Sequence, residues 1–163
     1  MKIKNRHILS KKNISNIIEK ISTNYRFDID LKNRVFESGI FDNKNLIFID
    51  DIPCFVLDDD NVYFTIFGIN LFKPKNKFIV VDMGAVKFVI NGADIMTPGI
   101  VDADIDIKID DQVWICDEKN KKVLATGIAL INGEDMNITK KGKAIKSQFF
   151  VGDLLWNSFA KSL

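Results

Sequence analysis

The chain has 163 residues, 47% of them hydrophobic and 28% charged, a balance that predicts a folded globular protein of one or two domains rather than a disordered chain. Its apolar runs are too short to span a bilayer and no apolar segment follows the basic N-terminus, so we expect neither a membrane anchor nor a secretory signal. One histidine and two distant cysteines exclude a disulfide scaffold, a four-thiolate zinc site and most histidine-based metal sites, and fit a reducing cytoplasm.

The charge is unevenly distributed along the chain. Residues 1–34 carry nine lysines and arginines against three acids, a net +6, whereas residues 35–118 carry a net −10 and residues 119–163 a net +5. Two interpretations fit this pattern: a dipolar surface that steers a polyanion to one side, or basic ends that are simply solvated.

The first half of the chain is typical of a small α+β domain. A helix is expected over residues 10–22, because apolar side chains recur there at helical spacing behind the N-cap candidate Ser10; these are Ile14, Ile17, Ile18 and Ile21. Strands are expected over 34–41, 46–50 and 53–57, and 62–72 fits either a strand or a short helix. Pro74 lies among three lysines, which indicates an exposed connection between domains 1–75 and 76–163.

The second half predicts short strands and brief helices. We expect a strand over 77–81, then a helix capped by Asp82 that buries Val86, Val89 and Ile90 and ends at Gly92. Strands over 112–116 and 122–131 flank a hairpin turn at 118–121, a short helix follows near 133–136, and 151–156 is expected to form the closing strand. This pattern favours a small barrel over a parallel α/β sheet.

Several of these segments carry a family resemblance. The run Val81–Ile100, with its Gly-Ala, Gly-Ala and Pro-Gly pairs, resembles the core of a PUA domain, an RNA-binding module named for pseudouridine synthases and archaeosine transglycosylases. Residues 111–115, 141–144 and 152–156 resemble its later blocks, with Asp110 where the family usually has glycine. The preceding segment resembles the pre-PUA domain of the oncogenic T-cell-lymphoma translation factors and their short archaeal relatives. The resemblance implies an α+β protein, with a pre-PUA domain followed by a PUA pseudo-barrel.

The resemblance also implies an RNA-binding groove, formed by the first helix, the loop after it and the last strand. Carried over to this chain, it places Lys87, Gly92, Asp94, Lys141 and Lys143 on or near that groove.

The residues themselves are compatible with this interpretation. Four cations occupy seven positions, a density that a phosphate backbone favours; they are Lys140, Lys141, Lys143 and Lys146. Phe149 and Phe150 follow, and we expect at least one of them to fill the core, which leaves Phe150 as a candidate for stacking on an unpaired base.

Other polar patterns give weaker indications. Asp102, Asp104 and Asp106 alternate with apolar residues and fit either a Mg²⁺ site or, as we favour, a solvated strand or loop. The run 58–61 is read as a hairpin turn and His7 as an exposed tail residue. We therefore expect no catalytic residue, no metal and no cofactor.

These observations favour a non-catalytic cytoplasmic RNA-binding protein of translation. The resemblance implies contact with the small ribosomal subunit and the acceptor end of tRNA, in initiation, reinitiation or recycling, and a possible protein partner with an initiation-factor-like domain. Two alternatives remain open: an enzyme or accessory protein of RNA modification, pseudouridine or archaeosine type, and a ribosome-assembly factor.

Overall fold

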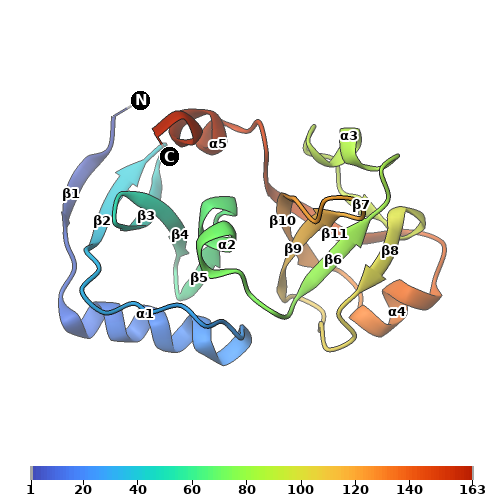
Figure 1. Cartoon of the computed structure of the whole chain (residues 1–163), viewed down its shortest axis with the longest axis horizontal. Coiled ribbons are helices and arrows are strands. Elements are labelled where there is room, and N and C mark those ends of the chain that lie inside the picture. The colour runs from blue at the N-terminus through green and yellow to red at the C-terminus, as the bar shows by residue number, and fades with distance from the viewer. Residues whose placement is uncertain (1, 163) are drawn as a thin grey trace. The chain divides into compact units, whose positions relative to one another are not determined.

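The computed structural model describes residues 2–162, which divide into two compact units (Figure 1). The first unit ends at Pro74 and the second begins at Lys75. Unit 1 contains an antiparallel sheet and unit 2 a mixed sheet, and each unit also contains helices. The chain therefore has the predicted α+β class.

Unit 1 is a five-stranded antiparallel meander with two helices. Its strands follow one another in space in the order β1-β2-β3-β4-β5. The elements are β1 (Lys4–Ile8), α1 (Lys11–Asn24), β2 (Phe36–Phe41), β3 (Lys44–Ile49), β4 (Ile52–Asp58), β5 (Asn61–Phe64) and α2 (Ile66–Phe72). The ambiguous segment 62–72 thus contains both a strand and a helix, joined at the helix cap Thr65.

Two-residue turns set the register of this sheet. Asp42 and Asn43 join β2 to β3, Asp50 and Asp51 join β3 to β4, and all four have positive φ, between 48° and 68°. Tight hairpins of this kind need left-handed backbone at both turn residues, and asparagine and aspartate adopt it more readily than other non-glycine residues.

Phenylalanines fill the core of unit 1. The ring centroid of Phe64 lies 4.9 Å from those of Tyr25 and Phe55 and 5.3 Å from that of Phe72. Helix α2 starts against this cluster, where the buried Thr65 hydroxyl donates to the Pro53 carbonyl (2.5 Å) and accepts from the Gly68 amide (3.1 Å). A Cβ at Gly68 would lie 2.1 Å from the Cys54 carbonyl oxygen, so the helix can pack this closely on β4 only with glycine there.

Unit 2 is a six-stranded sheet in the order β7-β11-β10-β9-β6-β8, with β6 and β9 parallel and every other pair antiparallel. The strands are β6 (Phe78–Val81), β7 (Ile95–Met96), β8 (Ile100–Ala103), β9 (Gln112–Asp117), β10 (Val123–Ala129) and β11 (Lys143–Phe150). The helical elements are α3 (Val86–Val89), the 3₁₀ turn η1 (Thr97–Gly99), α4 (Gly133–Ile138), α5 (Leu154–Phe159) and the 3₁₀ turn η2 (Ala160–Ser162).

The sheet of unit 2 curls into the predicted pseudo-barrel. Its two edge strands, β7 and β8, are separated in the chain only by the three residues of η1, which span about 10 Å at most, so the sheet must bend its edges together. Aliphatic side chains from the strands and α4 fill the interior, including the fully buried Ile79, Ile115, Met136 and Ile145.

Four expectations were wrong in detail. Residues 151–156 do not form the closing strand: β11 closes the sheet, and Asp153 caps helix α5 by accepting from the Trp156 amide (2.8 Å). His7 lies within strand β1 and not in a tail. Ile90 is exposed, because α3 is only one turn long and buries Val89 alone. Asp104 is buried rather than solvated, since its carboxylate accepts from the Lys77 amide (2.6 Å) and the Asp106 amide (3.0 Å).

Candidate nucleic-acid interface

A pocket of about 420 Å³ lies in unit 2 beside helix α3. Its walls are the turn before α3, the helix itself, the loop after it, β7 and η1. Most lining groups are apolar, and the polar ones are two carboxylates; the lining residues are Asp82, Gly84, Ala85, Phe88, Val89, Ala93, Asp94, Ile95, Met96, Pro98 and Gly99. A pocket of this size and character fits a flat, largely apolar group that carries hydrogen-bond donors at its edge.

Hydrogen bonds at both ends of α3 hold the pocket walls together. Before the helix, the Asp82 carboxylate accepts from the Ala85 amide (2.8 Å), and the Asp82 amide donates to the Gly99 carbonyl of η1 (3.0 Å). After the helix, Gly92 adopts φ +84°, and a Cβ there would lie 2.8 Å from the Phe150 ring. Glycine is therefore required both for the turn and for its close approach to Phe150.

Large hydrophobic side chains are exposed around this pocket. Phe88, which lines it, is 57% exposed, Met96, which also lines it, is 48% exposed, and Met83 beside it is 44% exposed. An exposed aromatic ring and thioethers around a pocket are typical of an interaction surface.

The two candidate aromatic residues on β11 do not line the pocket. Phe149 is buried, and Phe150 is half-buried, with its ring packed against Gly92 and the barrel core. Sequence reasoning missed Phe88, although the helical spacing contains a signal for it. Val86 and Val89 are expected on the buried face, and Phe88 is not three or four residues from either of them, so it is expected on the exposed face.

Lys143 and Asp94 form an ion pair next to the pocket. The Lys143 ammonium lies 2.8 Å from Asp94 Oδ2, and Asp94 Oδ1 accepts from the Ser147 amide at 2.8 Å. Lys143 also pairs with Met96 across β11 and β7. The pKa of Asp94 is lowered, mainly by the hydrogen bond from Lys143 and then by the Ser147 amide, with a smaller electrostatic contribution from Lys146.

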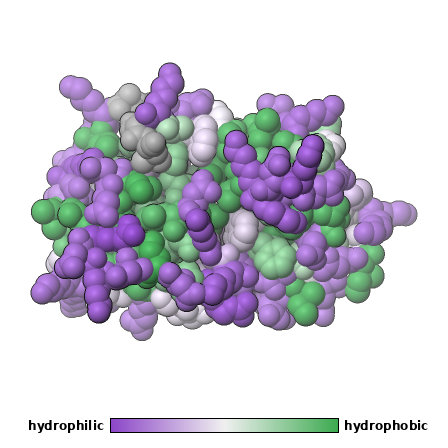
Figure 2. Space-filling view, in the orientation of Figure 1, coloured by the Kyte–Doolittle hydropathy of each residue, from purple (hydrophilic) through white to green (hydrophobic). Residues whose placement is uncertain are grey.

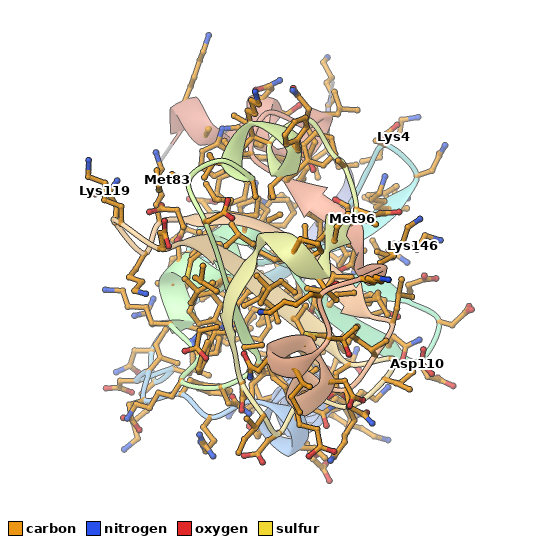
Figure 3. The ribbon with its side chains drawn as sticks, turned by 90° about the vertical axis from the view of Figure 1, so that its right-hand side faces the viewer. Lys4, Met83, Met96, Asp110, Lys119 and Lys146 are labelled. Atoms are coloured by element: carbon orange, nitrogen blue, oxygen red, sulfur yellow. The ribbon has the colours of Figure 1, made fainter. Side chains whose placement is uncertain are left out.

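The remaining lysines of the predicted cluster lie on the same strand or in the loop before it. Lys140 and Lys141 are exposed, and the loop is tied to η1 because the Gly142 carbonyl accepts from the Thr97 amide (2.9 Å). Lys146 is exposed on β11, on the same side of unit 2 as Met96 in Figure 3, whereas Lys119 lies at the opposite side. Within residues 2–162, none of Lys140, Lys141 and Lys146 forms an ion pair.

Lys87 lies on α3, next to the lining residue Phe88, and Gly92 lies in the loop after the helix, next to the lining residue Ala93. The Lys87 ammonium lies 5.1 Å from the centre of the Phe88 ring, so this cation is held beside the exposed aromatic side chain. The structure thus places Asp94 in the pocket lining, and Gly92 next to the lining residue Ala93. Lys143 pairs with Asp94, Lys141 lies in the adjoining loop and Lys87 on α3. The exposed groups that surround the pocket are aromatic, thioether and cationic.

The described residues contain no arrangement suited to a metal. Within residues 2–162 no group of three histidine, cysteine or acidic side chains converges. Both cysteines are buried, and burial raises the pKa of the Cys54 thiol to about 12 and also raises that of Cys116, which makes both poor nucleophiles and ligands at neutral pH. No helix in the described part of the chain is long and apolar enough to cross a membrane.

Comparison with known proteins agrees with this division of the chain. Residues 77–151 match the PUA domain, and residues 5–71 match a domain of unknown function (DUF1947). An uncharacterized protein of Methanocaldococcus jannaschii is 42% identical over 159 residues, which cover 96% of this chain and 98% of that protein. The crystal structure of a hypothetical protein from Pyrococcus horikoshii superposes with a TM-score of 0.81 at 32% identity and covers 94% of this chain and 98% of its own.

Eukaryotic relatives match a smaller part of the chain. Translation machinery-associated protein 20 of Saccharomyces cerevisiae is 32% identical over 66% of this chain and 67% of its own length. Malignant T-cell-amplified sequence 1 of Rattus norvegicus is 34% identical over 47% of this chain and 44% of its own. The resemblance and the fold class predicted from the sequence are thereby confirmed. The chain belongs to the family of PUA-domain proteins in which a DUF1947 domain precedes the PUA domain, the family of the M. jannaschii protein.

Proposed function

We propose that this protein is a non-catalytic RNA-binding protein of translation that holds an unpaired RNA end. The observation that carries the proposal is the apolar pocket next to Phe88, with unneutralised lysines in the loop and strand beside it. An unpaired base offers a flat apolar face to the pocket and to the Phe88 ring, and the lysines attract the phosphates that precede it.

The carboxylates refine which base the pocket accepts. Asp94 uses both oxygens on Lys143 and Ser147, while Asp82 uses Oδ1 on the Ala85 amide. The second oxygen of Asp82 can accept a hydrogen bond from an exocyclic amino group. Adenine, cytosine and guanine carry such a group and uracil does not, so the pocket is proposed to disfavour a terminal uridine.

The RNA we propose is the acceptor end of tRNA, bound on the small ribosomal subunit during initiation, reinitiation or recycling. Support comes from the PUA domain and from the name of the yeast relative, which associates that protein with the translation machinery. A partner with an initiation-factor-like domain is part of the same proposal.

The test compares two RNAs and three proteins: the wild type, Phe88→Ala and a control variant. One RNA is a labelled hairpin with a four-nucleotide unpaired 3′ tail, and the other is the same hairpin without the tail. We expect the wild type to bind the tailed RNA more tightly than the untailed one. In Phe88→Ala the ratio of the two affinities should fall about tenfold, since one stacked base contributes about 1–3 kcal/mol. Phe88 is exposed, so the variant should fold; Ile138→Ala, exposed on α4, is the matched control. Equal affinity of the wild type for the two RNAs would refute the proposal.

Crosslinking in cells separates this function from its alternatives. Mature small subunits and tRNA are expected as the crosslinked species. RNA carrying modification sites would favour an accessory role in RNA modification, and precursor rRNA would favour ribosome assembly.

A further inference from the structure

Unit 1 has a cationic surface of its own, which we call the N-terminal strip: Lys2, Lys4, Lys11 and Lys12. These residues lie before and on β1 and in the first turn of α1, and all are exposed. The first acidic residue of the chain is Glu19, so the strip has no neighbouring acid in the sequence. Lys4 extends away from its strand into solvent (Figure 3).

The fold does not neutralise the strip. Arg6, in the middle of β1, pairs with Glu37 (3.0 Å) and Asp51 and lies 4.6 Å above the Phe48 ring, so it has a structural role. No such partner exists for Lys4, Lys11 or Lys12 within residues 2–162. On β1, Arg6 therefore stabilises the fold, whereas Lys4 remains available to bind a ligand.

Lys11 and Lys12 do not stabilise helix α1 at the positions they occupy. They occupy the first turn of the 14-residue helix α1, which contains no acid, although the positive end of a helix favours acidic residues and disfavours lysine. The helix is held instead by its Ser10 cap and by the buried Ile17 and Ile21 on its other face. An anion bound there would relieve a repulsion that the folded protein alone leaves in place.

The surroundings of the strip are polar. In Figure 2 the left edge, where β1 lies in Figure 1, and the lower left edge, along which α1 runs, are mainly hydrophilic, with hydrophobic groups between the hydrophilic ones. Ile8 is 73% exposed, but the other residues of β1 are polar or charged, so this strand presents no continuous apolar face to a lipid surface.

We propose that the N-terminal strip is a second RNA contact, which binds the phosphate backbone without reading its sequence. This inference rests on the proposed function, because it takes the ligand of the strip to be RNA of the kind whose unpaired end the pocket of unit 2 is proposed to hold. The pocket then determines which end is recognised, and the strip adds affinity that depends on salt.

The experiment uses the full chain with Lys4→Glu, Lys11→Glu and Lys12→Glu combined. The matched control reverses three exposed lysines of the β9–β10 hairpin, Lys119→Glu, Lys121→Glu and Lys122→Glu, and so has the same change in net charge. Glutamate in the first turn favours a helix, so the strip variant keeps α1. Binding of the tailed and untailed hairpins is measured by fluorescence anisotropy at several salt concentrations, with circular dichroism as the check of folding.

We expect the strip variant to bind both hairpins about tenfold or more weakly, with the slope of log K against log salt reduced by about 2–3. The tail preference should remain that of the wild type. If the strip variant behaves like the hairpin control while the wild type still prefers the tailed RNA, the strip proposal is overturned and the proposed function stands. If the wild type shows no tail preference, the proposed function fails whatever the strip does. Loss of binding to phosphatidylserine vesicles, with RNA binding unchanged, would overturn the proposal in favour of a membrane contact.

Discussion

Asp94 shows how a single residue can join the binding surface to the fold. Its carboxylate connects the loop after α3 to β11, since it accepts from the amide of Ser147, 53 residues away, and pairs with Lys143. A carboxylate beside the proposed phosphate contact would repel an RNA ligand, yet Asp94 also orders the Lys143 ammonium that would attract it. Sequence reasoning placed Asp94 at the groove from the family resemblance, but the identity of its partners depends on a strand that is distant in the chain.

Asp94→Asn separates these two effects. The amide keeps an oxygen for the Ser147 N–H but removes the negative charge, which releases the Lys143 ammonium for phosphate. We expect RNA affinity to rise a few-fold, with the salt slope steeper by about 0.7–0.9. Asp94→Ala, which also removes the hydrogen bond to Ser147, is expected to lower the free energy of unfolding by about 1 kcal/mol. Weaker RNA binding by Asp94→Asn would show that the ion pair itself positions Lys143.

At the scale of elements, the sequence predicted those helices and hairpins whose formation depends on residues close together in the chain. Helix α1, the β9–β10 hairpin and α4 were expected close to their observed places, because their caps, turn residues and periodicity are local in the sequence. Strand β1 was not predicted, because its five residues are all exposed and therefore do not alternate between apolar and polar. Only its pairing with β2, which is distant in the chain, makes this segment a strand. Residues 151–156 were wrongly predicted as a strand because their apolar residues are typical of one, whereas Asp153 in the same segment caps helix α5.

The β9–β10 hairpin gives a pH-dependent prediction. Buried Asp117 accepts from the amides of Asn120 (2.5 Å) and Lys122 (3.1 Å), and these backbone hydrogen bonds lower its pKa against the opposing effect of burial. Because the pKa is lower in the folded state, the unfolded state takes up the proton first as pH falls. The stabilisation is thus present at neutral pH and is lost as pH drops below about 4.

Asp117→Asn tests this account. The variant is expected to be less stable than the wild type at pH 7, and the difference should shrink as pH approaches 3, where the wild-type carboxyl becomes protonated. Urea unfolding between pH 3 and 7 measures both. The neighbouring exposed Glu118→Gln serves as the control, and a stability difference that is independent of pH would contradict the argument.

At the scale of the whole molecule, the charge pattern acquires a physical meaning. The basic segment 1–34 supplies the strip of unit 1, and the basic segment 119–163 supplies the lysines beside the pocket. Many acids of the middle segment are used in turns and caps, such as Asp42, Asp50 and Asp117. The sequence could therefore predict that cations concentrate at both ends. It could not predict which of them stay unpaired, since Arg6 and Lys77 are neutralised by Glu37 and Asp111, residues that only the fold brings near.

Two cationic surfaces on separate units lead to a prediction about RNA length. If the proposals hold, an unpaired oligonucleotide of about six nucleotides uses only the pocket and the lysines of unit 2. Lys141→Glu with Lys143→Glu should then weaken its binding and flatten its salt dependence, whereas the strip variant should leave it unchanged. A full-length tRNA is expected to use both surfaces, so each variant should weaken its binding, and the combined variant should lose the sum of the two losses in log K because the sites share no residue. Isothermal titration with oligonucleotides of increasing length then locates the length at which the strip begins to contribute. If strip and pocket variants affect every length equally, the two surfaces do not act as separate contacts on one RNA.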